Sequence, residues 1–436
     1  MNAYEIVLSR NVGRMEVLAL IDPDSERRWT YREMLEAVDR RAKELAVNYA
    51  RGNTLRLEGR WTVDFIFDWL ASEKIGMNRM VVPSPLIPAP KEIVGYDKGG
   101  ATILFTSGTS GIPKGVVQYA DRFAVMQDKV EKSPWMPEIR VGELVALSLP
   151  TVIAGFIDIM RVFQYGGTVV ILQGRTPDEL WADIAMFKIN YAIMVTSIGM
   201  RLCKIPGLDL SNLRWVVLIG EPANPKPVRL LSKALAESGC ENPVKLAYGS
   251  TENGFVSAPD DFDGVAYKPF FGMKYRLVDT DENGFGNLQI YSDGTQMLEY
   301  YNNPVLTVKH FMKDGYGRTE DIARDLGNGL FRPYGRVDKR FSDGSFIFLV
   351  EERVGDIDGV FDVDIFPSLN GDYYAHTIFE TGVDEKAVKA EVNTVIRASR
   401  KERFESSYGW DWYPLSVASF KRDRIKMAKD AEATHA

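Results

Sequence analysis

The sequence predicts an α/β protein in which helices cover mostly parallel β-sheets. After about residue 100, short runs rich in β-branched residues alternate with helical segments. The clearest runs lie at 101–106, 167–172, 191–196 and 214–220, and all but the second end in Gly or Thr. Apolar strands that alternate with helices are typical of parallel sheet buried on both faces.

Helices are expected at 31–47, 177–188 and 226–238. The first segment places its apolar residues on one stripe, and Thr30 with Glu33 three residues later forms a capping-box pattern. The last two segments lie between the predicted strands, as crossover helices would.

The pattern of predicted elements changes twice towards the C-terminus of the chain. Between 270 and 350, Gly and Asp turns separate short alternating strands, which indicates a smaller, more antiparallel β region. Near residue 338 a compact α+β segment begins. We therefore expect a large N-terminal domain at 1–337 and a small domain at 338–436.

Composition excludes several classes of function. The 436 residues carry 53 Lys and Arg against 60 Asp and Glu, a net charge of −7, which disfavours general nucleic-acid binding. Two cysteines cannot form a disulfide framework or a four-ligand zinc site, and the presence of only three histidines counts against a His-based metal site. The N-terminus lacks a signal-like apolar stretch, and no segment has the roughly 20 apolar residues of a membrane span. We expect a soluble, cytoplasmic protein.

The segment ATILFTSGTSGIPKGVV at 101–117 carries the clearest chemistry. Glycines allow positive φ, so successive N–H groups can point into one concavity, and hydroxyls and a lysine add donors and charge. The segment predicts a phosphate cradle after a strand. Its candidate ligands are Thr106, Ser107, Gly108, Thr109, Ser110, Gly111 and Lys114.

Two other readings of this segment remain open. It can be a surface loop without a ligand, or Ser107 or Ser110 can be a hydrolase nucleophile, although no G-x-S-x-G frame is present. A Walker A loop is excluded because Lys114 is followed by Gly115 instead of Ser or Thr.

Residues 106–115 resemble the phosphate-binding loop of the adenylate-forming superfamily, which includes acyl-CoA synthetases, aryl-acid ligases, peptide-synthetase adenylation domains and luciferases. Further blocks that resemble this family follow in the same order. The resemblance implies ATP, AMP and Mg²⁺ as ligands, and a small C-terminal domain that is mobile.

The block KLAYGSTE, which ends at Glu252, resembles the family's second motif. It implies that Tyr248 lies in the nucleotide site, that Thr251 contacts the α-phosphate and that Glu252 holds Mg²⁺. A hydroxyl and a cation can stabilise the charge that develops on an attacked phosphate. Without its neighbours, Thr251-Glu252 would be read as a helix N-terminus with an acidic first turn.

Two later blocks resemble the family's ribose-binding and hinge motifs. DGYGRTED ends at Asp321, which by resemblance binds the ribose hydroxyls, although Glu320 stands where the family has Gly. FRPYGRVD implies that Arg336 contacts ribose or phosphate and that Asp338 is the pivot of domain rotation. The loop at 339–347, which in the family faces the active site in the thioester-forming state, departs from the family pattern.

The C-terminal block should contain a lysine that orients the carboxylate and the α-phosphate. Residues 420–426 match it best, with one residue fewer than usual, and we choose Lys426 with Lys421 in reserve. The competing reading is a solvated basic helix.

The acid pocket is inferred from the same resemblance. Positions where amino-acid activators carry an Asp are apolar here, which favours an aryl or medium aliphatic acid over an α-amino acid. Gly220 and Glu221 are expected beside the adenine. The pocket candidates are Ile153, Phe156, Ala247 and Gly249.

The resemblance implies ATP-dependent activation of a small carboxylic acid to an acyl adenylate with release of pyrophosphate. Transfer to the pantetheine thiol of CoA or of a separate carrier protein would follow. The alternative is a nucleotide-binding regulatory or scaffold protein that has this fold but little turnover. Only about twenty residues separate Pro83 from Ala101. A strand–helix–strand unit needs about 30 residues, so the N-terminal half looks shortened by one unit.

Overall fold

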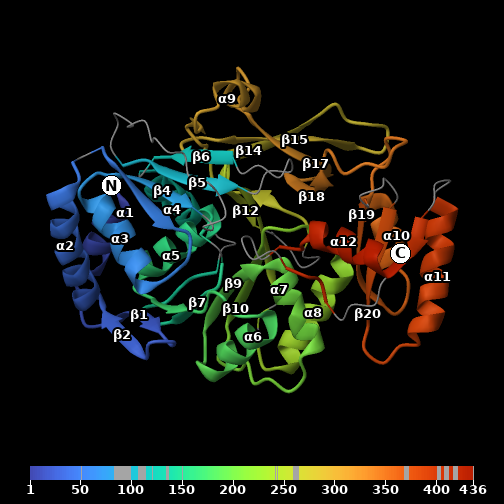
Figure 1. The fold of residues 1–436 in the computed structure, drawn as a ribbon, viewed down its shortest axis with the longest axis horizontal. Helices are drawn as coiled ribbons and strands as arrows, with labels where there is room; N and C mark the ends of the chain where they lie inside the picture. Colours follow the sequence, from blue (N-terminus) through green and yellow to red (C-terminus); the bar gives the residue numbers. More distant parts are fainter. Residues whose placement is uncertain are drawn as a thin grey trace.

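The computed structural model describes all residues except 51, 83–99, 107–113, 120, 134–136, 150, 241, 243, 259–264, 368–372, 400–403, 407–411, 416–420 and 436. Helices α1 (Ala3–Asn11) and α2 (Tyr31–Asn48) lie at one end of the molecule. The C-terminal α+β unit, which we call the lid (residues 338–436), lies at the other end (Figure 1).

The largest sheet has nine strands in the order β13-β12-β11-β10-β9-β7-β8-β1-β2. The six strands from β11 to β1 in this order are parallel to their neighbours, whereas β2, β12 and β13 pair antiparallel. The strands are β1 (Leu18–Asp22), β2 (Arg27–Thr30), β7 (Leu144–Leu147), β8 (Thr168–Ile171), β9 (Tyr191–Val195), β10 (Trp215–Ile219), β11 (Lys245–Ser250), β12 (Gly254–Ala258) and β13 (Lys268–Pro269).

A second sheet has five strands in the order β16-β6-β5-β4-β3. Strands β3, β4 and β5 are parallel, and β6 returns antiparallel to β5, so that Thr106 pairs with Lys114. The predicted phosphate loop therefore joins two antiparallel strands. The strands are β3 (Thr54–Glu58), β4 (Asn78–Val82), β5 (Thr102–Thr106), β6 (Lys114–Gln118) and β16 (Glu299–Tyr300).

The third sheet is antiparallel, as the turn-rich sequence between 270 and 350 predicts. Its order is β14-β15-β17-β18. The strands are β14 (Met273–Val278), β15 (Phe285–Ser292), β17 (Gly317–Gly327) and β18 (Leu330–Arg336). Strand β18 ends where the lid begins.

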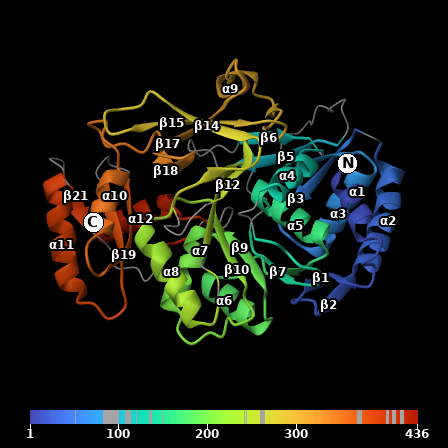
Figure 2. The ribbon, with the colours of Figure 1, turned by 180° about the vertical axis from the view of Figure 1, so that it is seen from behind.

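The lid has a three-stranded sheet of the order β19-β20-β21 and an apolar cluster of its own, drawn from residues 341–396. The strands are β19 (Val360–Pro367), β20 (Tyr373–Phe379) and β21 (Phe404–Ser406). Other apolar lid residues, such as Phe361 and Met427, pack into the main core of the large unit. The lid is therefore seated on the large unit by apolar contact, beside α8 (Figure 2).

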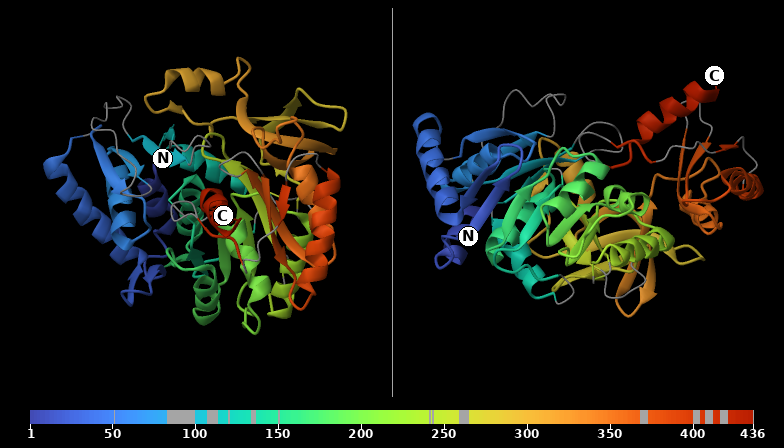
Figure 3. Two further views of the ribbon diagram at one scale, coloured as in Figure 1. Left: turned by 45° about the vertical axis from the view of Figure 1, so that its right-hand side comes forward. Right: turned by 90° about the horizontal axis from the view of Figure 1, so that it is seen from below.

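Helices pack against the sheets. In the large unit they are α3 (Val63–Lys74), α4 (Asp121–Glu131), α5 (Ile153–Tyr165), α6 (Pro177–Met186), α7 (Thr196–Met200), α8 (Pro225–Glu237) and α9 (Pro304–His310). Of these, α5 is buried along almost its whole length. A 3₁₀ helix spans Arg201–Lys204. In the lid they are α10 (Phe348–Gly355), α11 (Glu385–Ser399) and α12 (Arg424–His435), and α12 extends outward to the C-terminus (Figure 3, right).

The elements expected from the sequence are confirmed to within two residues at their ends. The capping box at Thr30 is also present, with the Thr30 side chain accepting from the Glu33 N–H and the Glu33 side chain accepting from the Thr30 N–H. Within the described ranges, no helix is long and apolar enough to cross a membrane.

A buried carboxyl group in the lid predicts a pH-dependent stability. Burial raises the pKa of Glu351 to about 7, and the nearby Asp364 carboxylate acts in the same direction. Since the folded chain binds this proton more tightly than the unfolded chain, Glu351 contributes stability below pH 4.5 that is lost as the pH rises to about 7.

We therefore expect the unchanged protein to lose stability as the pH rises from 4.5 to 7. In Glu351→Gln this contribution to the pH dependence should be absent. Thermal unfolding midpoints of both proteins at pH 5 and pH 7 measure it. Parallel changes in the two midpoints would contradict the expectation.

Candidate active site

The predicted site residues of the large sheet lie at the carboxyl ends of its parallel strands. Gly220 and Glu221 follow β10, and Tyr248 lies near the end of the neighbouring strand β11. Loops at the carboxyl ends of adjacent parallel strands meet at one edge of the sheet, which is where open α/β sheets bind ligands. The sheet therefore brings these residues together.

Thr251 and Glu252 form a turn between β11 and β12, so the reading as a helix N-terminus is wrong. The Gln118 side chain donates to the Thr251 carbonyl at 2.6 Å, and the Met297 N–H donates to the Glu252 carbonyl at 2.6 Å. The Tyr300 hydroxyl donates to Oε1 of Glu252 at 3.0 Å. The turn is thus held by strands β6 and β16 of the five-stranded sheet and by Met297, which precedes β16.

The phosphate-loop candidates are only partly described. Thr106 and Lys114 are the paired ends of β5 and β6, and the ammonium of Lys114 lies 5.8 Å from the ring centroid of Tyr300. Since Tyr300 bonds Glu252, Lys114 lies on the same side of the site as the predicted magnesium ligand. The other candidates, Ser107, Gly108, Thr109, Ser110 and Gly111, lie outside the described residues.

Tyr248, Asp321 and Arg336 form one hydrogen-bonded group. The Tyr248 hydroxyl donates to Oδ2 of Asp321 at 2.5 Å, and the Arg336 guanidinium lies 3.6 Å from Oδ1. Arg336 also donates to the Thr319 carbonyl at 2.9 Å and pairs with Glu320. Burial raises the pKa of Asp321, and the positive charge of Arg336 opposes this shift.

Glu320 has a φ of +59°, the left-handed conformation that Gly adopts most readily. The chain therefore keeps a left-handed turn at the position where the family has Gly. The ion pair between Glu320 and Arg336 holds this side chain beside the site.

The lid supplies one lysine to this edge of the sheet. A Cβ placed on Gly220 would lie 3.3 Å from Cε and 3.8 Å from Nζ of Lys421, so the lysine stem runs against the bare Gly220 backbone. Burial lowers the pKa of Lys421, while the carboxylates of Glu221 and Asp321 favour its charged form. The structure thus brings Lys421 to the predicted site.

Lys426, our first choice from the sequence, lies elsewhere. It is on the exposed face of α12, where its N–H donates to Oδ1 of Asp423 at 3.0 Å. Lys421 precedes α12, so the solvated basic helix accounts for Lys426 and not for Lys421. The shortened motif can be aligned on Lys426 or on Lys421, and of these two lysines Lys421 is the one that contacts Gly220.

The predicted acid-pocket residues lie on two elements. Ile153 begins α5, and Ala247 and Gly249 lie on β11. Phe156 is fully buried, and its ring centroid lies 4.9 Å from that of Trp61 and 5.0 Å from that of Trp69. Phe156 therefore belongs to an aromatic cluster of the core.

The predicted pivot, Asp338, is exposed and lies two residues beyond β18. The preceding Val337 N–H still donates to the Glu320 carbonyl at 2.9 Å, and the Lys339 N–H donates to the Arg336 carbonyl at 3.1 Å. The backbone is thus anchored up to the pivot position.

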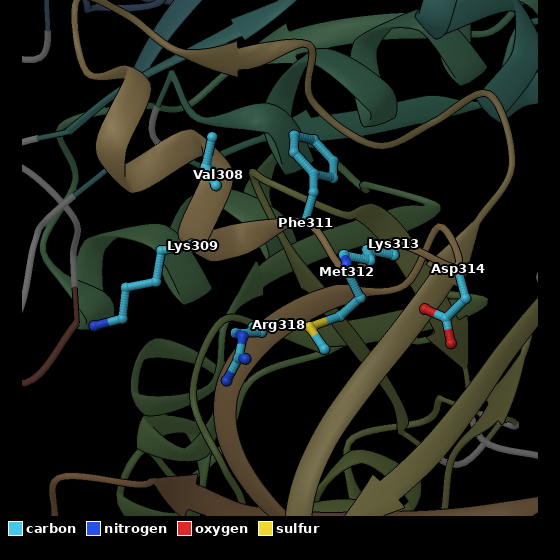
Figure 4. Close-up of a pocket in the computed structure, with 7 residues that line it drawn as sticks. All are labelled: Val308, Lys309, Phe311, Met312, Lys313, Asp314 and Arg318. Atoms are coloured by element: carbon cyan, nitrogen blue, oxygen red, sulfur yellow. The ribbon is translucent and has the colours of Figure 1, made fainter.

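An open pocket lies apart from this site, at α9 and the start of β17 (Figure 4). It is lined by Val308, Lys309, Phe311, Met312, Lys313, Asp314 and Arg318. None of the predicted site residues lines it, and Asp314 is paired with Arg276 at 2.5 Å.

The residues that the structure describes contain no cluster of three or more His, Cys, Asp or Glu able to hold a metal ion. Across the same residues Glu252 forms no ion pair, so its carboxylate is not neutralised by a neighbouring cation. A carboxylate that forms no ion pair fits Mg²⁺, which usually binds one or two carboxylates together with substrate phosphates.

The chain is similar to known proteins. The model of the AMP-binding enzyme family matches residues 96–301. Acetyl-coenzyme A synthetase of Bacillus subtilis (strain 168) is 27% identical over 278 residues, covering 59% of this chain and 46% of that protein. The 2-succinylbenzoate–CoA ligase of Bacillus pumilus (strain SAFR-032) is 28% identical over 265 residues, covering 58% and 49%. The chain thus spans about half the length of these curated relatives.

A solved structure extends the likeness of the fold to the whole chain. The anthranilate CoA ligase AuaEII in complex with anthranoyl-AMP has a TM-score of 0.79 at 17% identity, covering 100% of this chain and 98% of that chain. Residues 96–301 are thus similar to AMP-binding enzymes, and the chain as a whole shares the fold of this solved ligase.

Proposed function

We propose that this protein activates a small carboxylic acid with ATP, forming an acyl adenylate and pyrophosphate. The observation that carries the proposal is the meeting of Lys421 from the lid with Asp321 and Gly220 of the large unit. A cation brought by a separate unit to a nucleotide-binding edge is suited to a reaction in which charge develops on phosphate.

The proposed roles follow from the contacts. Asp321 accepts hydrogen bonds from the ribose hydroxyls, and Tyr248 and Arg336 hold its carboxylate in place. Lys421 orients the acid against the α-phosphate and stabilises the charge that builds there. Thr251 contributes a hydroxyl donor to the phosphate, and the hydrogen bond from the Gln118 side chain to its carbonyl holds the turn in place. The seated lid excludes water from the mixed anhydride.

Glu252 would hold Mg²⁺, with Tyr300 fixing one carboxylate oxygen by its hydrogen bond. When bound, the ion supplies Lewis-acid stabilisation to the phosphate oxygens. Lys114, on the same side of the site, would contribute positive charge to the phosphate tail.

We propose an aryl or medium aliphatic acid as substrate, because Ile153 and Ala247 are apolar and buried. The relatives named for 2-succinylbenzoate and anthranilate support an aryl acid. Their names as CoA ligases support transfer of the acyl group to the thiol of CoA, with a separate carrier protein as the other candidate acceptor. Rotation of the lid about Asp338, the boundary between units 1–337 and 338–436, would expose the adenylate to the thiol.

Pyrophosphate release with ATP and Mg²⁺, measured across a panel of aryl, aliphatic and α-amino acids, tests the proposal. We expect release with at least one aryl or medium aliphatic acid and none with free α-amino acids. Binding of ATP without release from any acid would overturn it and favour a nucleotide-binding scaffold.

A further inference from the structure

The carboxylate of Glu221 contacts both the large unit and the lid. Its Oε2 accepts the Ser197 N–H at 3.1 Å, and its Oε1 accepts the Arg422 N–H at 2.8 Å. Ser197 lies in α7, which follows β9, whereas Arg422 belongs to the lid. Both oxygens of Glu221 are therefore used, one on each side of the boundary between the units.

The large-unit side of this link is held in place. The Thr196 hydroxyl donates to the Glu221 carbonyl at 3.1 Å, and the preceding Gly220 adopts a φ of +96°. Residues other than Gly are strained at that φ, so the tight turn aims the Glu221 side chain at the lid.

The lid side is held as well. The Arg422 guanidinium bonds Oδ2 of Asp362 at 2.5 Å, lies 3.7 Å from Asp364, and stacks 4.0 Å from the ring centroid of Tyr413. Asp362 also accepts from the Asn224 side chain of the large unit at 3.3 Å. Since the Arg422 side chain is fastened to the lid sheet, its backbone N–H is a fixed donor.

Arg422 is the residue next to Lys421, whose stem runs against Gly220. The hydrogen bond from the Arg422 N–H to Glu221 therefore fixes the position of the neighbouring Lys421 backbone relative to the site. We propose that Glu221 is a positioning residue, which fastens the lid backbone so that Lys421 reaches the reacting groups during adenylation.

This inference rests on the proposed function and changes the role that the sequence suggested for Glu221. A residue that contacts adenine acts on ATP binding and so on KM. A residue that positions Lys421 acts on kcat of adenylation, and its bond must break before the lid can rotate for thiol transfer.

The test compares Glu221→Ala and Glu221→Gln with the control Glu237→Gln, an exposed carboxylate at the end of α8. Adenylation is measured by pyrophosphate exchange, and transfer by reaction of preformed acyl adenylate with CoA. We expect Glu221→Ala to lower kcat of adenylation about 10- to 100-fold, with KM for ATP within about twofold and transfer unimpaired. Glu221→Gln should lose less, because its amide oxygen can still accept one of the two N–H groups.

Equal losses in both half-reactions, a rise in KM alone, or full adenylation by Glu221→Ala would each overturn the proposal. A second measurement does not depend on activity. Spin labels at Ala236→Cys on α8 and Lys386→Cys on α11, in a Cys203→Ser background, report the distance between the units. We expect one narrow distribution in the parent and a broader one after Glu221→Ala, and identical distributions would contradict the link. A broadened distribution in a protein that activates no acid would reject the proposed function and leave the link standing.

Discussion

Replacing Lys421 with Ala is expected to slow acyl-adenylate formation by about 10²- to 10³-fold, the cost of losing one preorganised charge that stabilises a transition state. Lys421 is the lid residue whose ammonium stands beside Gly220, with the carboxylates of Glu221 and Asp321 nearby. The substitution removes the charge and leaves the apolar contacts between the lid and the large unit unchanged. Pyrophosphate exchange with a productive acid measures the effect.

Lys426→Ala is the matched control, because Lys426 lies on the exposed face of α12 five residues further along. We expect this variant to retain adenylation within about twofold, as surface substitutions usually do. Transfer from preformed acyl adenylate should be unimpaired in both variants. A large loss in Lys426→Ala together with an active Lys421→Ala would reverse the assignment.

The second large effect concerns stability and lies in the five-stranded sheet. Arg79 and Glu73 form a fully buried ion pair at 2.9 Å. Arg79 also donates to the Thr102 hydroxyl at 3.0 Å and to two backbone carbonyls, one of which is that of Gly100. The guanidinium therefore fastens β4 to the start of β5, the strand that leads into the phosphate loop.

We expect Arg79→Met to lower the free energy of unfolding by about 3–5 kcal/mol, because it leaves the Glu73 carboxylate buried without the cation that balances its charge. Burial already raises the pKa of Glu73, which shows how unfavourable its charge is there. Urea unfolding followed by tryptophan fluorescence measures the loss.

The double variant Arg79→Met/Glu73→Gln distinguishes charge burial from lost packing. Removing both charges should recover most of the stability, since no uncompensated charge stays buried. If the double variant is as unstable as the single one, the hydrogen bonds of Arg79 to the strand ends carry the effect instead.

Local patterns sufficed for most of the secondary structure. Thr30 and Glu33 cap α2, and the apolar runs became β8, β9 and β10, because periodicity and capping act over a few residues of chain. The motif order also led to Tyr248 and Asp321, which the fold brings within 2.5 Å of each other across 73 residues of chain.

By itself, the sequence determined the α/β class, the course of the strands and the chemical types gathered at the site. Only the tertiary structure decided which lysine reaches that site and what Glu221 contacts. Lys421 and Lys426 are equally basic and close in sequence, and contact with Gly220 across the boundary between the units separates them. Such contacts depend on how the lid packs on the large unit, which is a sum of many long-range interactions that no short segment encodes.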